Sequence, residues 1–198
     1  MSHRLAEVLE SIDLANASDP SRLIFEGVEY PAALVEGRRA QWWVRHLRLE
    51  ASDPLLIAAR GHHLRRWEIP RESYPRDRAG YLAWRTRLYD FHAEAVADLM
   101  QRGGYSQDTV AHGQRLLRKE GIKVDVDAQT YEDAVSLAFL EVRLRPFIET
   151  VTDEQLTRTP PHVAQDERPG DTKRHSRSSS SPQLPRRCVE RSRSEPWE

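Results

Sequence analysis

Apolar residues recur at spacings of three and four along most of the first 150 positions, and polar residues fill the positions between them. This period is typical of amphipathic helices that bury one face in a core. No segment alternates convincingly with the period of two that indicates strands, although the stretch SRLIFEGVEYP could include a short extended piece. We therefore expect an all-α domain of about six helices, over residues 5–17, 31–49, 53–68, 78–100, 106–119 and from 130 onward.

Residues that favour helix starts indicate where the individual helices begin. Asp53 can accept hydrogen bonds from free backbone amides and Pro54 suits a first turn, so together they predict the start of the third helix. That helix would continue past His63, which would lie on a face that begins apolar. The segment TYED at 130–133 has the form of a capping box, and it predicts that the sixth helix begins there.

The helical pattern stops near residue 150. Residues 151–198 have almost no aliphatic side chains but many prolines, a serine run and several Arg-Ser pairs, so they cannot bury enough apolar surface to offset their chain entropy. We expect a helical domain over residues 1–150 and a disordered tail over residues 151–198. The composition agrees, because only 38% of the 198 residues are hydrophobic while 31% are charged.

Charge and cysteine content narrow the class of protein. The formal net charge of -1 gives no global argument for binding nucleic acid or a membrane surface. A single cysteine, Cys188, excludes an internal disulfide framework and is typical of a reducing compartment. The N-terminus has no long apolar run, and no window approaches the roughly 18 apolar residues that span a bilayer. We therefore expect an intracellular, cytoplasmic protein that does not enter a membrane.

Two histidines and an acid on neighbouring predicted helices form a candidate metal site. His63, His92 and Asp133 are of the residue types that bind divalent metals in helical bundles. A metal could polarise a phosphoryl oxygen and acidify a bound water, as phosphoester hydrolysis requires, with Glu68 or Glu132 assisting the catalysis. Two other interpretations stay open: each histidine could be a hydrogen-bonded core residue, and Asp133 could serve only to cap its helix.

The loop before the fourth helix, and the start of that helix, are dense with arginine. Guanidinium groups present forked donors that match phosphate oxygens, and the aromatic side chains among them could stack on a base or a sugar. We expect the following residues to bind a phosphorylated substrate: Arg66, Trp67, Arg71, Tyr74, Arg78, Tyr81 and Arg85. The alternative is a solvated face on which these arginines pair with the acids of the same segment. Two prolines in WEIPRESYP argue for a loop of fixed shape.

The stretch HHLRRWEIPRESYPRDRAGYLAWRTRLYDFHAEAVADLMQRGGY resembles the domain of unknown function 4202 family, as do ESIDLANASDP, EGVEYPAALVEGRRAQWW and TYEDAVSLAFLE. The resemblance covers about residues 10–150. It implies an all-helical intracellular domain, and it implies no particular activity.

A more distant resemblance is to the HD superfamily of metal-dependent phosphohydrolases. His63, in AARGHHLRRW, stands where these proteins place a histidine–aspartate pair, and EDAVSLAFLE resembles their later aspartate-bearing helix. The resemblance implies an HD-like bundle and puts Asp133 in the ligand role. Leu64 stands at the position of the pair's aspartate, and His92 could supply a replacement ligand.

Two hypotheses about function follow, and whether the protein is an enzyme stays open between them. In the first, an HD-like domain binds or hydrolyses a phosphorylated small molecule such as a nucleotide, with the help of a divalent metal. In the second, the chain is a non-catalytic module that recognises RNA or a protein partner through its arginine and aromatic surface. Ligand atoms of His63, His92 and Asp133 that converge on one point would favour the first, and histidines packed separately would favour the second.

Overall fold

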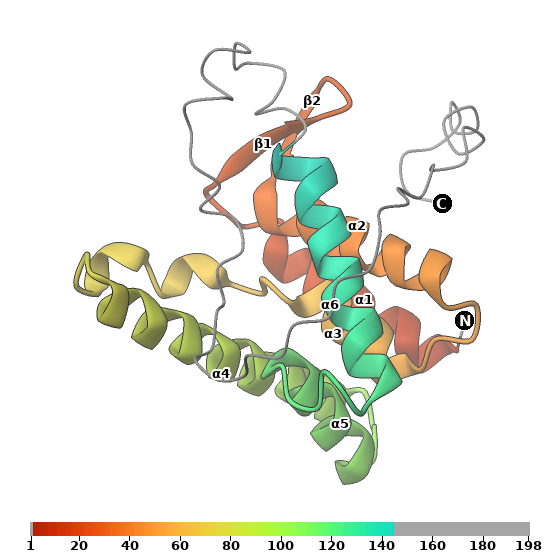
Figure 1. Ribbon diagram of the computed structural model, residues 1–198. Coiled ribbons are helices and arrows are strands. Elements are labelled where there is room, and N and C mark those ends of the chain that lie inside the picture. Colours follow the sequence, from red (N-terminus) through yellow and green to blue (C-terminus); the bar gives the residue numbers. More distant parts are fainter. Residues whose placement is uncertain (1, 145–198) are drawn as a thin grey trace, which may run out of the picture. The chain divides into compact units, whose positions relative to one another are not determined.

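Six α-helices and one short β-hairpin form the part of the chain that the computed structural model describes, residues 2–144 (Figure 1). The α-helices are α1 (His3–Asn16), α2 (Ala32–Leu47), α3 (Asp53–Gly61), α4 (Arg78–Arg102), α5 (Gln107–Leu117) and α6 (Val126–Phe139). The shorter elements are β1 (Arg22–Phe25), β2 (Val28–Pro31), the 3-10 turns η1 (Arg66–Glu68) and η2 (Arg71–Ser73), and the π-helical turn η3 (Leu140–Leu144). The prediction of an all-α domain is confirmed.

The short helix α3 lies at the centre of these helices, because each of the other five contacts it. Its residues from Pro54 to Ala59 are all buried, and Ser52 caps its first turn by accepting a hydrogen bond from the backbone N–H of Leu55. A helix that is apolar on every side belongs in a core. Figure 1 shows α6 crossing in front of α3, and the long helix α4 next to α5. The central position of α3 holds its C-terminal end, and the histidines that follow, at a fixed place.

The strands β1 and β2 pair as an antiparallel hairpin in which Phe25 lies opposite Val28. The two residues between them, Glu26 and Gly27, have positive φ angles of 51° and 80°. Two successive residues of this kind form the tight turn whose twist suits a hairpin. The possible extended piece in SRLIFEGVEYP is confirmed as this hairpin.

The third helix ends at Gly61, earlier than the predicted residue 68, so His63 lies in the turn after the helix and not on a helix face. The Leu64 carbonyl, which a longer helix would use for its own hydrogen bond, accepts a hydrogen bond of 3.0 Å from His92 Nδ1. Arg65 then takes a left-handed conformation with a φ of 51°, which turns the chain out of the helix. The spacing of apolar residues along the chain cannot reveal a hydrogen bond between such a carbonyl and a side chain of another helix.

The sixth helix begins at Val126, and the predicted capping box at 130–133 is wrong. Asp125 caps the helix by accepting a hydrogen bond of 2.8 Å from the backbone N–H of Asp127. Thr130 lies inside the helix, where its hydroxyl donates to the Val126 carbonyl. The earlier start is held by tertiary contacts, because the buried Asp127 carboxylate also accepts a hydrogen bond of 2.7 Å from the Ser52 hydroxyl.

The loop between α3 and α4 has a fixed shape, as its prolines and aromatic residues predicted. Trp84 Nε1 donates to the Ile69 carbonyl at 2.9 Å, which ties the loop to α4. The Arg71 guanidinium donates to two loop carbonyls, those of Tyr74 at 3.0 Å and Pro75 at 2.7 Å. The loop is therefore held by one hydrogen bond from α4 and by two within the loop itself.

Helices α4 and α5 begin and end close to their predicted bounds. The predicted boundary at residue 150 and the predicted tail over residues 151–198 lie outside the described residues. Within residues 2–144, no helix combines the length and the apolar character that crossing a membrane requires.

Candidate functional site

Glu36 and His63 form a hydrogen-bonded pair where α2 meets the end of α3. The two helices approach closely at Gly37, where a Cβ atom would overlap the backbone carbonyl of Arg60. His63 Nδ1 donates to one Glu36 oxygen at 2.6 Å, and Arg143 Nε donates to the other at 2.6 Å. Burial alone would raise the pKa of Glu36, but His63 and Arg143 outweigh burial and hold this pKa well below its usual range. Glu36 is therefore a buried carboxylate that stays charged and orients the His63 ring.

Two further imidazoles, those of His62 and His92, are buried next to His63. Their ring centres lie 4.1 Å and 6.2 Å from that of His63. Burial, reinforced by repulsion from His63, lowers the pKa of both, and that of His92 falls from 6.5 to about 3. The neutral His92 ring donates from Nδ1 to the Leu64 carbonyl at 3.0 Å. Its buried Nε2 has no hydrogen-bond partner among residues 2–144.

Three arginines lie over an aromatic surface on the first half of α4. The guanidinium carbon of Arg66 is 4.7 Å from the centre of the Trp84 ring, and that of Arg71 is 5.9 Å from it. The guanidinium carbon of Arg85 is 5.7 Å from the centre of the Tyr81 ring. Attraction between a cation and an aromatic face stabilises this arrangement by about 0.5 to 2 kcal/mol for each contact.

These three arginines have no carboxylate partner in the part of the chain that the structure describes. Arg66 NH1 donates a hydrogen bond of 3.4 Å to His63 Nε2. Burial lowers the pKa of Arg66, although the more distant Glu36 opposes this. Arg71 donates to backbone carbonyls, and Arg85 donates to tyrosine hydroxyls. All three are half-buried. We call them the unpaired arginines, and their positive charge is not balanced by an adjacent acid.

The predicted substrate-binding residues divide into two groups. Those at the aromatic surface, brought together around Trp84, are Arg66, Arg71, Tyr81 and Arg85. Of the other three, Trp67 and Tyr74 are half-buried in the loop, and Arg78 is exposed in the first turn of α4. The first group forms one continuous surface.

Asp133 does not join His63 and His92. It is exposed on α6, beside the buried Ala134, and accepts a hydrogen bond of 2.8 Å from Gln129 in its own helix. Among the described residues, no group of three or more His, Cys, Asp or Glu side chains is arranged to hold a metal ion. The predicted ligand set therefore does not come together, because Asp133 lies on the solvent side of α6. Metal binding itself stays a prediction.

The acids that were predicted to assist catalysis, Glu68 and Glu132, are engaged elsewhere. Glu68 is exposed and lies 3.4 Å from Arg65 in an ion pair within the loop. Glu132 forms an ion pair of 2.8 Å with Lys119. The acid that contacts His63 is Glu36 instead.

Sequence reasoning missed Glu36 and Arg143. Glu36 offered a signal, because it lies on the buried face of α2 four residues before Ala40 and eight before Val44. A charged residue within an apolar stripe needs a partner and marks a candidate site. Arg143 offered no such signal, since it reaches Glu36 across 107 positions of the chain.

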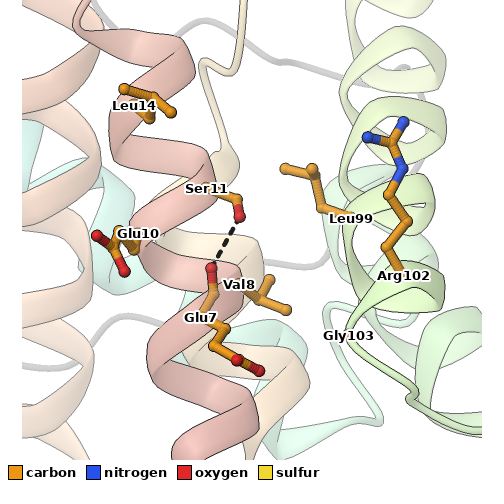
Figure 2. A pocket seen from close by; sticks show the side chains of 8 residues that line it. All are labelled: Glu7, Val8, Glu10, Ser11, Leu14, Leu99, Arg102 and Gly103. Atoms are coloured by element: carbon orange, nitrogen blue, oxygen red, sulfur yellow. Dashed lines mark hydrogen bonds between the residues drawn. The ribbon is translucent and has the colours of Figure 1, made fainter.

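A separate pocket of about 450 Å³ lies between α1 and the end of α4 (Figure 2). Its lining residues are Glu7, Val8, Glu10, Ser11, Leu14, Leu99, Arg102 and Gly103. The Ser11 hydroxyl donates to the Glu7 carbonyl in its own helix, and Arg102 pairs with Asp98. None of the residues predicted to form a site lines this pocket.

Comparison with protein families matches residues 6–159 to a family described as a domain of unknown function (DUF4202). Comparisons with curated proteins and with solved structures gave no match. The resemblance to the HD superfamily therefore stays a prediction.

Proposed function

The chain belongs to the DUF4202 family, and because the description of that family gives no activity, we propose from the geometry of the site that the protein binds a phosphorylated small molecule. The unpaired arginines Arg66, Arg71 and Arg85 hold the phosphate oxygens. One observation supports this most: three half-buried guanidinium groups share one surface, without a carboxylate partner among residues 2–144.

A bound phosphate would supply the charge that these arginines lack. A half-buried cation without a counter-charge gives up part of its hydration without full compensation. Attraction to the rings of Trp84 and Tyr81 offsets part of the lost hydration free energy, and Glu36 attracts Arg66 from a distance. Phosphate oxygens accept pairs of hydrogen bonds from the forked donors of a guanidinium group. A phosphate therefore fits the surface in both charge and shape.

The depth of the arginines favours a small ligand over RNA or a protein partner. Phosphate groups along a nucleic-acid backbone are contacted mainly by cations that project into solvent. Arg66, Arg71 and Arg85 are instead half-buried against aromatic rings, whereas Arg76 and Arg78 are exposed. A compact anion can reach between packed side chains where a polymer cannot.

Calorimetric titration of the full chain with pyrophosphate and with ADP tests this proposal. We expect Arg66→Gln to weaken the affinity by about 10- to 100-fold, because it removes a charged donor that contributes about 1.5 to 3 kcal/mol. The matched control is Arg102→Gln, which removes an arginine at the other end of α4 that is exposed and paired with Asp98. Equal losses in both variants, or binding of single-stranded RNA without binding of either small anion, would contradict the proposal.

A further inference from the structure

We propose that the ligand carries two or more linked phosphate groups, and that the site recognises this phosphate chain and not the organic group attached to it. This inference rests on the proposed function, because the unpaired arginines must first bind phosphate. It adds the class of ligand to that function: a diphosphate or a longer polyphosphate, either free or attached to a nucleoside.

The unpaired arginines belong to a row in which cations and aromatic rings alternate. The guanidinium carbon of Arg71 lies 5.9 Å from the centre of the Trp84 ring and 6.0 Å from that of Tyr81. The guanidinium carbon of Arg85 lies 5.7 Å from the centre of the Tyr81 ring and 5.5 Å from that of Tyr89. In order, the row consists of Arg66, Trp84, Arg71, Tyr81, Arg85, Tyr89 and Lys119. We call it the cation–aromatic row, and in it each unpaired arginine shares a ring with the next.

The row is extended along α4. Tyr81, Arg85 and Tyr89 are four residues apart on this helix, so they lie on one face and each step advances about 6 Å along the axis. Arg66 and Arg71 reach the same surface from the loop before α4. An elongated anion therefore fits the row better than a single compact phosphate.

The unbalanced charge of the row is limited to the three arginines. Lys119 Nζ lies 5.5 Å from the centre of the Tyr89 ring, but it also forms an ion pair of 2.8 Å with Glu132. Burial lowers the pKa of Arg66, and repulsion from Arg85 adds to this effect, so the charges within the row act on one another. One phosphate monoester carries a charge of about -1.5 to -2 at neutral pH, which leaves part of the arginine charge unbalanced. A second, linked phosphate supplies the rest.

Arg66 is suited to hold the first phosphate. Its NH1 donates to His63 Nε2 at 3.4 Å, while its Nε and NH2 donors have no partner in the described part of the chain. Such a free pair of donors matches two oxygens of one phosphate. Arg71 contacts the same ring as Arg66 and can reach the same phosphate, whereas Arg85 contacts the next ring of the row. We therefore assign the second phosphate to Arg85.

The rings of the row are already used by its cations. Trp84, Tyr81 and Tyr89 are each contacted by two of these cations. A base would stack on the same ring surfaces that the cations contact. The row therefore offers donors to a phosphate chain and no specific contact to a base.

The test is a calorimetric titration of the full chain with three matched pairs of anions: inorganic phosphate and AMP, pyrophosphate and ADP, and tripolyphosphate and ATP. We expect pyrophosphate and ADP to bind about 10- to 100-fold more tightly than inorganic phosphate and AMP, because they gain the charged donors of Arg85. The two members of each pair should bind within about threefold of each other, because the base is not contacted.

The variant Arg85→Gln tests the assignment of the second phosphate. We expect it to weaken the binding of pyrophosphate and ADP by about 10-fold or more, and to leave that of inorganic phosphate and AMP unchanged. Unchanged binding of AMP also shows that the variant is folded. Arg85→Lys keeps the charge and should retain part of the preference for ADP. The matched control is Arg87→Gln, at an exposed arginine of α4 that pairs with Glu94 outside the row, and it should keep all the affinities.

The inference and the proposed function fail in distinguishable ways. If inorganic phosphate and AMP bind as tightly as pyrophosphate and ADP, the inference is overturned and the proposed function stands. Binding of ADP without binding of pyrophosphate would show that the nucleoside is recognised, which also overturns the inference. Equal losses for AMP and ADP in Arg85→Gln would overturn the assignment of the second phosphate. If none of the six anions binds, the proposed function itself is wrong.

Discussion

Two groups of arginines differ in how the fold balances their charge. The paired arginines, Arg38, Arg39 and Arg60, lie on α2 and α3, and each has a carboxylate partner. Arg60 donates two hydrogen bonds to Asp13, at 2.7 Å and 2.9 Å, and Arg39 donates two to Glu141, at 2.9 Å and 2.8 Å. The unpaired arginines are also half-buried, and like Arg39, which lies 4.2 Å from the centre of the Trp42 ring, they contact aromatic rings. Their hydrogen bonds, however, go to carbonyls, hydroxyls and the His63 ring, and to no carboxylate among residues 2–144.

The difference separates arginines that hold the fold together from arginines that are available to a ligand. A bidentate pair between arginine and carboxylate satisfies both charges inside the protein, so removal of either partner leaves a buried charge alone. An arginine against an aromatic ring keeps its charge unbalanced and its donors partly free. The surface over Trp84 is therefore suited to an anion, whereas the contacts of Asp13 and Glu141 are already complete.

Among the substitutions that test this difference between the two groups of arginines, we expect the one at Asp13 to have the largest effect on stability. Asp13→Asn removes the counter-charge of both Arg38 and Arg60, whose ion pairs with Asp13 are mostly shielded from solvent. We expect the free energy of unfolding to fall by about 3 to 5 kcal/mol, as when one partner of a buried pair is lost. Denaturant unfolding at neutral pH measures this. The control Asp98→Asn breaks an exposed pair and should cost less than about 1 kcal/mol. A similar midpoint for Asp13→Asn and the wild type would mean that these arginines do not depend on their partner.

The helices of the fold could be predicted from the sequence because each buries an apolar stripe, and Leu5, Val8, Leu9 and Ile12 are buried as their spacing indicates. The ends of α3 and α6 could not be predicted. They are fixed by contacts with distant residues, such as the bond from His92 to the Leu64 carbonyl across 28 positions. Local periodicity contains no information about such contacts.

The candidate site was predicted in part for the same reason. Arg66, Arg71, Tyr81 and Arg85 follow one another in a short segment, so the sequence placed them together. The pairing of Glu36 with His63 could not be predicted from the sequence, because 27 positions separate the two residues. Asp133 was chosen by its residue type and by the resemblance of EDAVSLAFLE to an aspartate-bearing helix, and neither decides which side of α6 faces the core.

Lowering the pH should destabilise the folded protein through His92, on the side of the molecule where the unpaired arginines lie. His92 has a pKa of about 3 in the folded protein and 6.5 as its ordinary value, so between these values only the unfolded chain binds the proton. Stability is therefore unaffected above about pH 6.5 and falls as the pH decreases below it. At pH 5 the loss from His92 alone is about 2 kcal/mol. Urea unfolding at pH 7 and pH 5 measures it.

The variant His92→Leu isolates this contribution. Its stability at pH 7 reflects lost contacts, but its decrease from pH 7 to pH 5 should be about 2 kcal/mol smaller than that of the wild type. His62 is also buried and has a lowered pKa, so part of the pH dependence should remain in the variant. An identical decrease in both proteins would show that His92 is not the group that resists protonation.

The smallest effect on stability is expected at Arg66, and it separates the two groups of arginines most directly. Arg66→Leu replaces an unpaired cation over Trp84 with an apolar side chain, so the free energy of unfolding should change by less than about 1 kcal/mol or should rise. Arg60→Leu leaves Asp13 without its bidentate partner and should cost several times as much. Thermal and denaturant unfolding of both variants without ligand measure the difference. Equal destabilisation would mean that Arg66 supports the fold as Arg60 does, and the surface over Trp84 would then lose its claim to be a binding site.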